Sequence, residues 1–264
     1  MKLNNFLGIA ALCLIFTSCS KDEANPSSGI GSMQVEFDNV VGKEDLQMNT
    51  KSYINSNGES FKVSTLRYFV SNFKLKTADG KEFSVPQDSC YFLIDETDKN
   101  SQTIKLKNVP EGDYSQISFV LGVDSLRNTM EVGKRAGNLD IGGKATGMYW
   151  SWNSGYIFFK MEGESPQAPL DNAGKNMFRY HIGGFGGLTS KTINNVKTIT
   201  LAISGSAKVR TNNTPMLHLL ADISKVFSGK NTVKIAQNST VMFNEFSTKI
   251  AENYTNIFTV DHVH

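Results

Sequence analysis

Residues 61–75 read FKVSTLRYFVSNFKL, a long run of aromatic and β-branched side chains. Residues of these types are enriched in β-strands. Asp79-Gly80 follows this run, and a second short segment, EFSV, occupies residues 82–85. Because Asp-Gly between two such segments is a strong hairpin signal, this region predicts two antiparallel strands joined by a tight turn.

The chain outside this hairpin continues with short strand-like segments at close spacing. They cover residues 33–37, 90–94, 103–106, 114–123, 148–161 (with a bend at Ser154-Gly155), 196–203 and 216–223. Helical signals are limited to residues 222–227, long enough for one or two turns, and residues 240–258, where apolar side chains recur at three- and four-residue steps. Many short strands at such spacing are typical of a sandwich or barrel. We expect an all-β, β-sandwich-like single domain over residues 33–264, with a short C-terminal helix.

The first 32 residues are expected to lie outside this domain. Residues 1–18 carry one charge, Lys2, and an apolar run over 6–16 that is too short to span a bilayer, as in a secretory signal peptide. Thr17-Ser18-Cys19 is similar to a bacterial lipobox, in which Cys19 is lipidated; the alternative is an ordinary signal peptide cut elsewhere. Residues 19–32 then form a polar tether, whose two acids resemble the surface-export signal of Bacteroidetes lipoproteins. We expect an outer-membrane lipoprotein, on the periplasmic side or at the cell surface.

Composition and motifs argue against several classes of function. Lys and Arg exceed Asp and Glu by only 27 − 25 = 2, so no basic excess points to a nucleic-acid partner. The sequence has no Walker loop, no zinc pair of cysteines and no Gly-x-Ser-x-Gly elbow, and residues 183–187 lack the spacing of a dinucleotide fingerprint. With Cys13 in the signal and Cys19 lipidated, Cys90 has no partner for an internal disulfide. We therefore expect a protein that is not an enzyme.

The chain ends in VDHVH, residues 260–264, which contains two of its four histidines. In a strand, positions two apart face the same side about 6.5–7 Å apart, so His262 and His264 can converge on one ion. Imidazole suits copper or zinc. The alternative is a frayed terminus that binds nothing. Asp261 is expected to face away from the two histidines.

The other two histidines differ in their surroundings. His181 lies beside glycines in FRYHIGG, residues 178–184, where the backbone can approach a ligand closely. It is a candidate third ligand, or a core histidine satisfied by a backbone carbonyl. His218 lies in the apolar segment MLHLL, residues 216–220, and is expected to be structural.

Both tryptophans lie in one segment, MYWSWNSGY at residues 148–156. If this segment is extended, Trp150 and Trp152 point to the same face. Three interpretations stay open from the residues alone. The tryptophans pack in the core, where large aromatics dominate burial, or form a platform on which sugars stack, or lie beside a metal ion.

These motifs together resemble those of the MbnP-like copper-binding proteins. The resemblance rests mainly on the central part of the chain: MYWSW and GY within residues 148–156, Lys160, Glu162-Gly163 and His181-Ile182-Gly183. Further support comes from LRYFVSN at 66–72, GVDS at 122–125, Asn253, Phe258 and HVH at 262–264. It spans residues 33–264, and the C-terminal ending matches Bacteroidetes members. It implies an all-β secreted or outer-membrane protein that binds copper through histidines and an oxidised tryptophan (kynurenine). It also implies a di-haem peroxidase-like partner where that oxidation occurs.

One departure concerns the first strand, in which many copper-binding members have a histidine. This chain has Phe37-Asp38-Asn39 there instead. A lost ligand would mean weaker copper binding, another metal, or a scaffold that no longer binds metal.

We therefore expect a lipid-anchored, extracytoplasmic, non-catalytic copper-binding protein. The expected ligands are His262 and His264, with His181 as the candidate third and with Trp150 or Trp152, the candidates for oxidation, near the ion. One alternative is a glycan-binding surface lipoprotein that uses the two tryptophans as a stacking platform. Another is a purely structural surface protein. The expected partners are the membrane, through the lipid anchor, and the di-haem peroxidase-like protein, with no nucleic acid.

Overall fold

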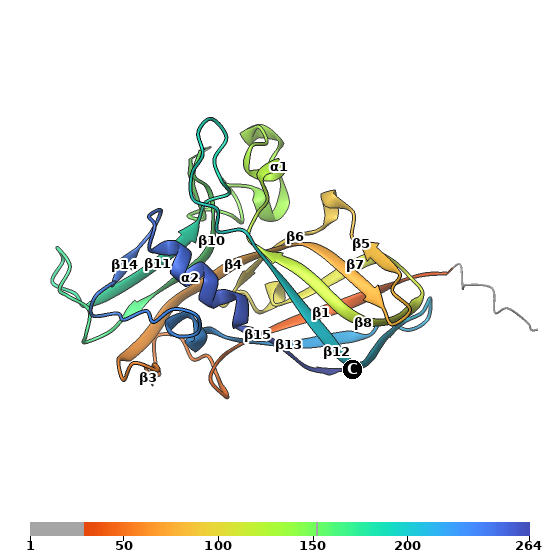
Figure 1. The fold of residues 1–264 in the computed structure, drawn as a ribbon, viewed down its shortest axis with the longest axis horizontal. Coiled ribbons are helices and arrows are strands. Elements are labelled where there is room, and N and C mark those ends of the chain that lie inside the picture. Colours follow the sequence, from red (N-terminus) through yellow and green to blue (C-terminus); the bar gives the residue numbers. More distant parts are fainter. Residues whose placement is uncertain (1–28, 152) are drawn as a thin grey trace, which may run out of the picture.

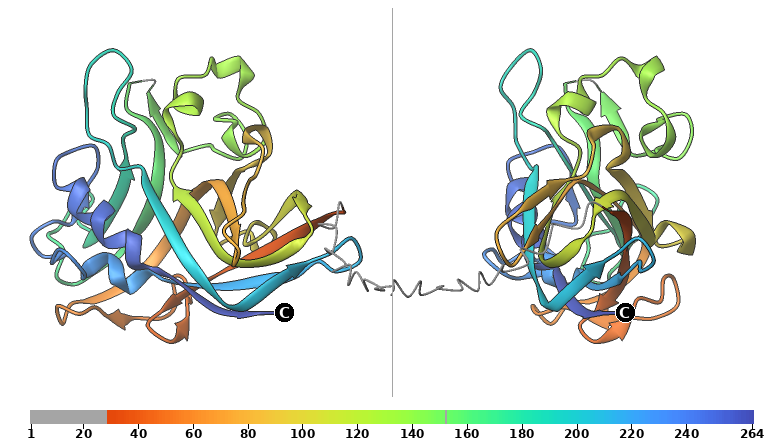
Figure 2. Two further views of the ribbon diagram at one scale, coloured as in Figure 1. Left: turned by 45° about the vertical axis from the view of Figure 1, so that its right-hand side comes forward. Right: turned by 90° about the vertical axis from the view of Figure 1, so that its right-hand side faces the viewer.

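Two β-sheets form the framework of the chain in the computed structural model, which describes residues 29–151 and 153–264 (Figures 1 and 2). The smaller sheet has five strands: β1 (Ile30–Val41), β2 (Glu44–Asp45), β7 (Thr103–Pro110), β13 (Met216–Asp222) and β15 (Phe258–Val263). The larger sheet has ten: β3 (Tyr53–Ile54), β4 (Ser60–Thr77), β5 (Glu82–Ser84), β6 (Tyr91–Asp95), β8 (Gly112–Leu121), β9 (Tyr149–Ser151), β10 (Gly155–Glu164), β11 (Met177–Gly183), β12 (Lys197–Val209) and β14 (Thr240–Val241). The expectation of an all-β, sandwich-like fold is confirmed.

Strand β4 contains the run at residues 61–75 and lies at the centre of the larger sheet, between β8 and β10. Its apolar side chains are buried over most of the run, as expected for a strand covered on both faces. The predicted hairpin is present, because β4 pairs with β5 in antiparallel register from Lys74 opposite Ser84. Gly80 makes the turn with φ +90°, a conformation that glycine adopts without steric cost.

Aromatic rings between the two sheets make the centre of the core. Phe37 of β1 lies 5.8 Å from Phe119 of β8 and 6.3 Å from Tyr68 of β4, measured between ring centroids. Phe258, the first residue of β15, lies 5.2 Å from Phe119. These four side chains are at most 3% exposed. The core therefore fixes β1 and β15 of the smaller sheet directly against β4 and β8 of the larger one.

Helices in the described part of the chain are short. The α-helices are α1 (Ser125–Asn128) and α2 (Ser247–Asn253), and the 3-10 helices are η1 (Gln87–Ser89), η2 (Lys99–Ser101), η3 (Val132–Lys134), η4 (Gly137–Leu139), η5 (Ile223–Phe227) and η6 (Tyr254–Asn256). The expected turn at residues 222–227 is present as η5, and Asp222 caps it by accepting a hydrogen bond from the Ser224 amide.

The expected helix over residues 240–258 is too long at both ends. Thr240 and Val241 pair with β11 as strand β14, and Phe258 already belongs to β15. The helical segment is α2 with η6, which together cover residues 247–256. The prediction used only the spacing of apolar residues, which is helical over the whole segment. Strand pairing at each end and the aromatic core around Phe258 instead determine the structure of the two ends.

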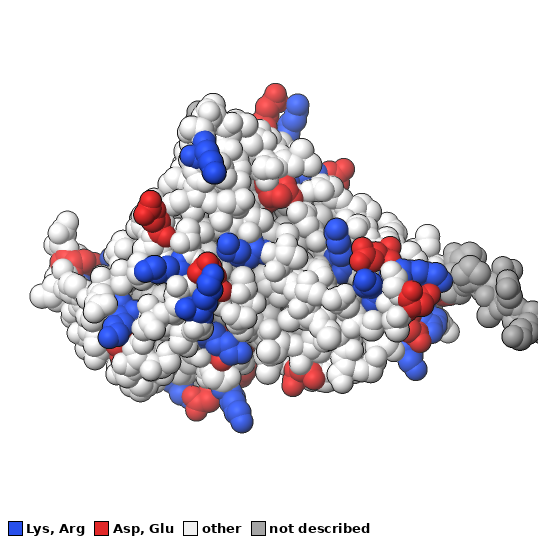
Figure 3. All heavy atoms as spheres, in the orientation of Figure 1, with Lys and Arg blue, Asp and Glu red and all other residues white. Residues whose placement is uncertain are grey.

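The predicted signal peptide (1–18), Cys19, most of the tether and Trp152 lie outside the described residues. Within the described residues, no helix has both the length and the apolar character to cross a membrane. Cys90 is a free, buried thiol. On the face shown in Figure 3, acidic and basic side chains are interspersed over a largely uncharged surface, as expected from the small net charge.

Candidate metal centre

Three neighbouring strands of the smaller sheet place a group of histidines and carboxylates on its outer face. Strand β13 pairs in parallel with β1 and antiparallel with β15, and His218 of β13 lies opposite both Glu36 and His262. Side chains alternate along β13: Leu217 and Leu219 are fully buried, whereas His218 is only half-buried. The alternation therefore turns His218 away from the core and toward the histidines of β15. We call His218, Asp261, His262 and His264 the histidine cluster.

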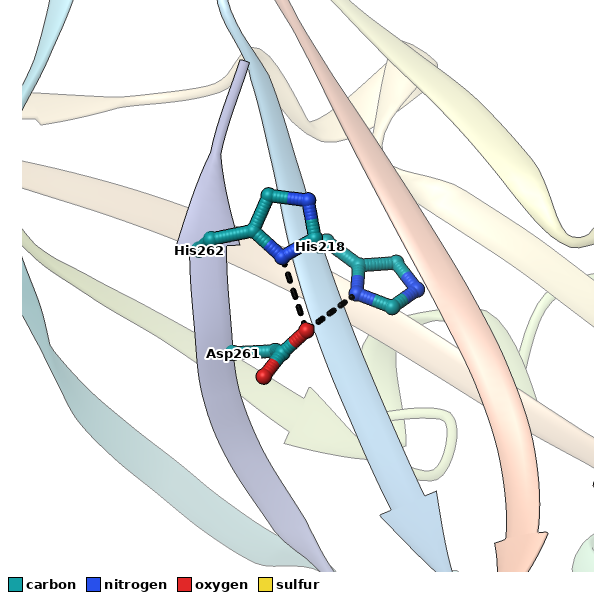
Figure 4. Close-up of side chains that lie close together, drawn as sticks. All are labelled: His218, Asp261 and His262. Atoms are coloured by element: carbon teal, nitrogen blue, oxygen red, sulfur yellow. Dashed lines mark hydrogen bonds and ion pairs between the residues drawn. The ribbon is translucent and has the colours of Figure 1, made fainter. Parts of the chain in front are cut away.

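Asp261 joins the histidine cluster because β15 contains a bulge. The pairing runs from His218 opposite His262 directly to Leu219 opposite Val260, so that Asp261 is an extra residue in β15. A bulge re-aims the side chain of the inserted residue. The expectation that Asp261 faces away from the histidines is wrong for this reason. Its Oδ2 lies 2.7 Å from Nδ1 of His262 and 3.1 Å from Nδ1 of His218 (Figure 4).

His262 and His264 converge as the spacing of two predicts. Their Nε2 atoms lie 2.6 Å apart and their ring centroids 4.2 Å apart. Oδ2 of Asp261 contacts Nδ1 of His262, so that Nε2 of His262 is the ring nitrogen that faces His264. At metal–nitrogen distances of about 2.0–2.1 Å, one ion can be bound by both Nε2 atoms.

His218 was expected to be structural, and the structure instead brings it into the cluster. Its ring centroid lies 4.9 Å from that of His262. Its Nδ1 faces Asp261, and its Nε2 lies 3.6 Å from Oδ2 of Asp38 on β1. Asp38 thus stands in the first strand, where a histidine ligand was expected from the family resemblance.

The two carboxylates have different electrostatic surroundings. Hydrogen bonds from His262 and then His218 hold the pKa of the exposed Asp261 below its usual value. Burial raises the pKa of Asp38, Asp45 raises it further, and His218 opposes both. Asp261 is therefore ionised at neutral pH, and its Oδ2 contacts both imidazoles.

The donor atoms fit a metal ion. One ligand atom from each of His218, Asp261 and His262 lies within 4.8 Å of the others, and His264 adds a second Nε2 beside that of His262. Imidazole nitrogens with a carboxylate oxygen suit copper, zinc or nickel. The side chains of Asp261 and His262 are 46% and 45% exposed, so an ion reaches them without any opening of the fold.

His181, the candidate third ligand, lies elsewhere. It belongs to β11 of the larger sheet, and its Nε2 lies 2.5 Å from Oε1 of Glu162 on β10. In Figure 1, β11 lies at the left, far from the C-terminus at the lower right. Burial lowers the pKa of His181, and Glu162 partly opposes this. The structure thus separates His181 from His262 and His264. The histidine that lies beside this pair is His218.

Trp150 also belongs to the larger sheet. It lies on β9, which pairs with the start of β10, and its ring packs edge-to-face on Phe243 at 5.9 Å. A β-carbon added at Gly183 would meet its Cζ3 at 2.8 Å, so the ring lies directly against Gly183 of β11. These contacts are packing contacts, and they lie on the sheet that does not carry the histidine cluster.

An open hollow borders the histidine cluster along the free side of β15. Asp261, His262, Val263 and His264 line it together with residues 204–206 and Lys208 of β12, Asn213 and Pro215. His262 and His264 are exposed and line this hollow, so a small molecule or a donor group of a partner can reach them.

Comparison with known proteins gives two matches. The sequence profile of the MbnP family matches residues 30–243, a range that includes Asp38 and His218 and ends before β15. Among solved structures, the chain is similar to MbnP from Methylosinus trichosporium, with a TM-score of 0.55 and 17% identity over 82% of each chain. At this identity the likeness concerns the fold. No curated protein matches the chain.

Proposed function

Because the chain belongs to the MbnP family, we propose that it is an extracytoplasmic, non-catalytic copper-binding protein whose ion is held by the histidine cluster. The observation that carries this proposal is the convergence of His262, His264 and His218 around one carboxylate on the outer face of the smaller sheet. Imidazole nitrogens and the Irving–Williams order together favour copper among the divalent ions.

The position of the cluster supports exchange of the ion rather than permanent storage. Its exposed side chains border an open hollow, so a partner or chelator can reach the ion while it is still bound. A buried structural site, by contrast, has a closed ligand shell. We therefore propose that the protein accepts and passes on copper.

Copper titration of the tag-free protein, expressed from residue 20 onward, tests this function. We expect one copper ion per chain, measured by metal analysis after removal of unbound ion. Glu162→Gln, which alters the partner of His181 on the larger sheet, serves as a matched control and should leave this stoichiometry unchanged. A metal-free protein after incubation with excess copper would contradict the proposal.

The lipid anchor is part of the same proposal and rests on Thr17-Ser18-Cys19. We expect Cys19→Ser to move the protein from the membrane fraction to the soluble fraction, because the variant lacks the thiol that would carry lipid. Cell fractionation and the mass of the processed N-terminus check this. A variant that stays membrane-bound with unchanged processing would exclude the lipobox interpretation.

Oxidation of Trp150 or Trp152 by a di-haem peroxidase-like partner stays a prediction of the family resemblance. Since Trp150 lies on the other sheet, its oxidation would not supply a ligand to the histidine cluster. The glycan-binding alternative needs an exposed stacking face, and the packing of Trp150 on Phe243 gives it no specific support.

A further inference from the structure

We propose that the histidine cluster binds Cu(II) in preference to Cu(I), and that Asp38 is a positioning residue that sets this preference. The inference rests on the proposed function and adds the oxidation state of the ion. It follows from the kinds of donor atom in the cluster and from the charge around them.

The donor atoms of the cluster are nitrogen and oxygen. His218 and His262 offer imidazole nitrogens within 4.8 Å of a carboxylate oxygen of Asp261, and Nε2 of His264 lies beside that of His262. Soft thiolate and thioether donors select Cu(I), whereas nitrogen and oxygen donors in a tetragonal arrangement are typical of Cu(II) or Ni(II). Among divalent ions, Cu(II) binds such donors most tightly.

Negative charge flanks the cluster on two sides. His218 stands between two carboxylates, with Asp261 Oδ2 at 3.1 Å from its Nδ1 and Asp38 Oδ2 at 3.6 Å from its Nε2. Two further acids lie on this side of the cluster, because Glu36 of β1 lies opposite His218 and Asp45 of β2 lies opposite Val40 of β1. A carboxylate attracts a doubly charged ion twice as strongly as a singly charged one, and this difference favours Cu(II).

Asp38 acts on the ion through His218. The structure places its carboxylate beside the imidazole rather than among the atoms of Asp261 and His262 that share one ion. At 3.6 Å this is an ion-pair distance and not a hydrogen bond, so Asp38 acts through its negative charge beside the far nitrogen of the ring. Asp38 therefore influences the ion as the neighbour of His218 and not as a ligand.

Met216 is the residue that could reverse this preference. It lies opposite His264, and the two exchange backbone hydrogen bonds of 3.2 and 2.9 Å. Met216 and His218, two residues apart on β13, share one face. If the Met216 thioether took part in binding, the cluster would favour Cu(I).

The test measures the affinity of the tag-free protein for Cu(II), against a Cu(II) chelator, and for Cu(I), under reducing anaerobic conditions against a Cu(I) chelator. Asp38→Asn removes one charge and keeps the side-chain shape. With water-like screening over about 6 Å, we expect about a tenfold loss of Cu(II) affinity and about a threefold loss of Cu(I) affinity. Glu131→Gln, an equal change of charge on an exposed residue next to η3, should alter neither the Cu(II) affinity nor the Cu(I) affinity.

The electron paramagnetic resonance spectrum of the Cu(II) form should show a tetragonal site with coupling to nitrogen.

Two results would overturn the inference while leaving the proposed function intact. One is tighter binding of Cu(I) than of Cu(II), with Met216→Leu weakening the Cu(I) complex. The other is an Asp38→Asn variant whose two affinities change by the same factor or not at all. If neither copper ion binds, the proposed function fails together with the inference.

Discussion

The double variant His262→Ala/His264→Ala is expected to lose more than about tenfold in copper affinity, at about 1.4 kcal/mol for each tenfold change. The two Nε2 atoms, 2.6 Å apart, are the donors best placed to share one ion, and their removal leaves only His218 and Asp261. The fold should be unaffected, because both residues are exposed at the end of β15. Copper titration followed by isothermal calorimetry measures the loss, and thermal unfolding of the metal-free proteins checks the fold.

His181→Ala is the control for this variant. It removes an imidazole from β11 of the larger sheet and should leave copper affinity unchanged. Titration curves that coincide for the wild type and the double variant would remove His262 and His264 from the ligand set. A loss of copper in His181→Ala alone would move the site to the larger sheet.

Phe258→Ala should lower the free energy of unfolding by about 3–5 kcal/mol, the usual cost of deleting a buried aromatic side chain. Phe258 begins β15, and its ring lies 5.9 Å from those of Phe37 and Tyr68 and 5.2 Å from that of Phe119. It therefore anchors the strand that carries Asp261, His262 and His264 to the core. Urea unfolding followed by circular dichroism measures the change.

The neighbouring change Thr259→Ala is the control, since Thr259 is exposed. Exposed substitutions usually change stability by no more than about 0.5 kcal/mol. If Phe258→Ala destabilised the protein no more than Thr259→Ala does, the aromatic cluster between the sheets would not hold β15 in place. We also expect Phe258→Ala to weaken copper binding, because a loosened β15 no longer fixes its histidines beside His218.

The sheet framework could be predicted because its signals are local. The aromatic and β-branched run at residues 61–75 and the turn at Asp79-Gly80 determine β4 and β5 from their own residues. The bend at Ser154-Gly155 likewise separates β9 from β10. The helix over residues 240–258 was overextended because apolar spacing carries no information on which strand is available for pairing. Val241 pairs with Tyr180 of β11, a partner about sixty residues earlier in the chain.

The candidate site was predictable only in part. The spacing of His262 and His264 on one strand is a local signal, and the structure confirms that their rings converge. His218 was missed because MLHLL is apolar on both sides of the histidine, so the segment does not tell which face is outward. Its position follows from the pairing of β13 with β1 and β15. The bulge that turns Asp261 toward His262 is likewise a property of the pairing between β13 and β15. No residue type in this segment predicts such a bulge.

Anomalous X-ray diffraction at the copper edge, from crystals of the copper-loaded protein, tests the copper site most directly. We expect one strong peak about 2.0–2.1 Å from Nε2 of both His262 and His264, within reach of His218 and Asp261. A peak beside His181 and Glu162 or beside Trp150, with none at the histidine cluster, would contradict the assignment.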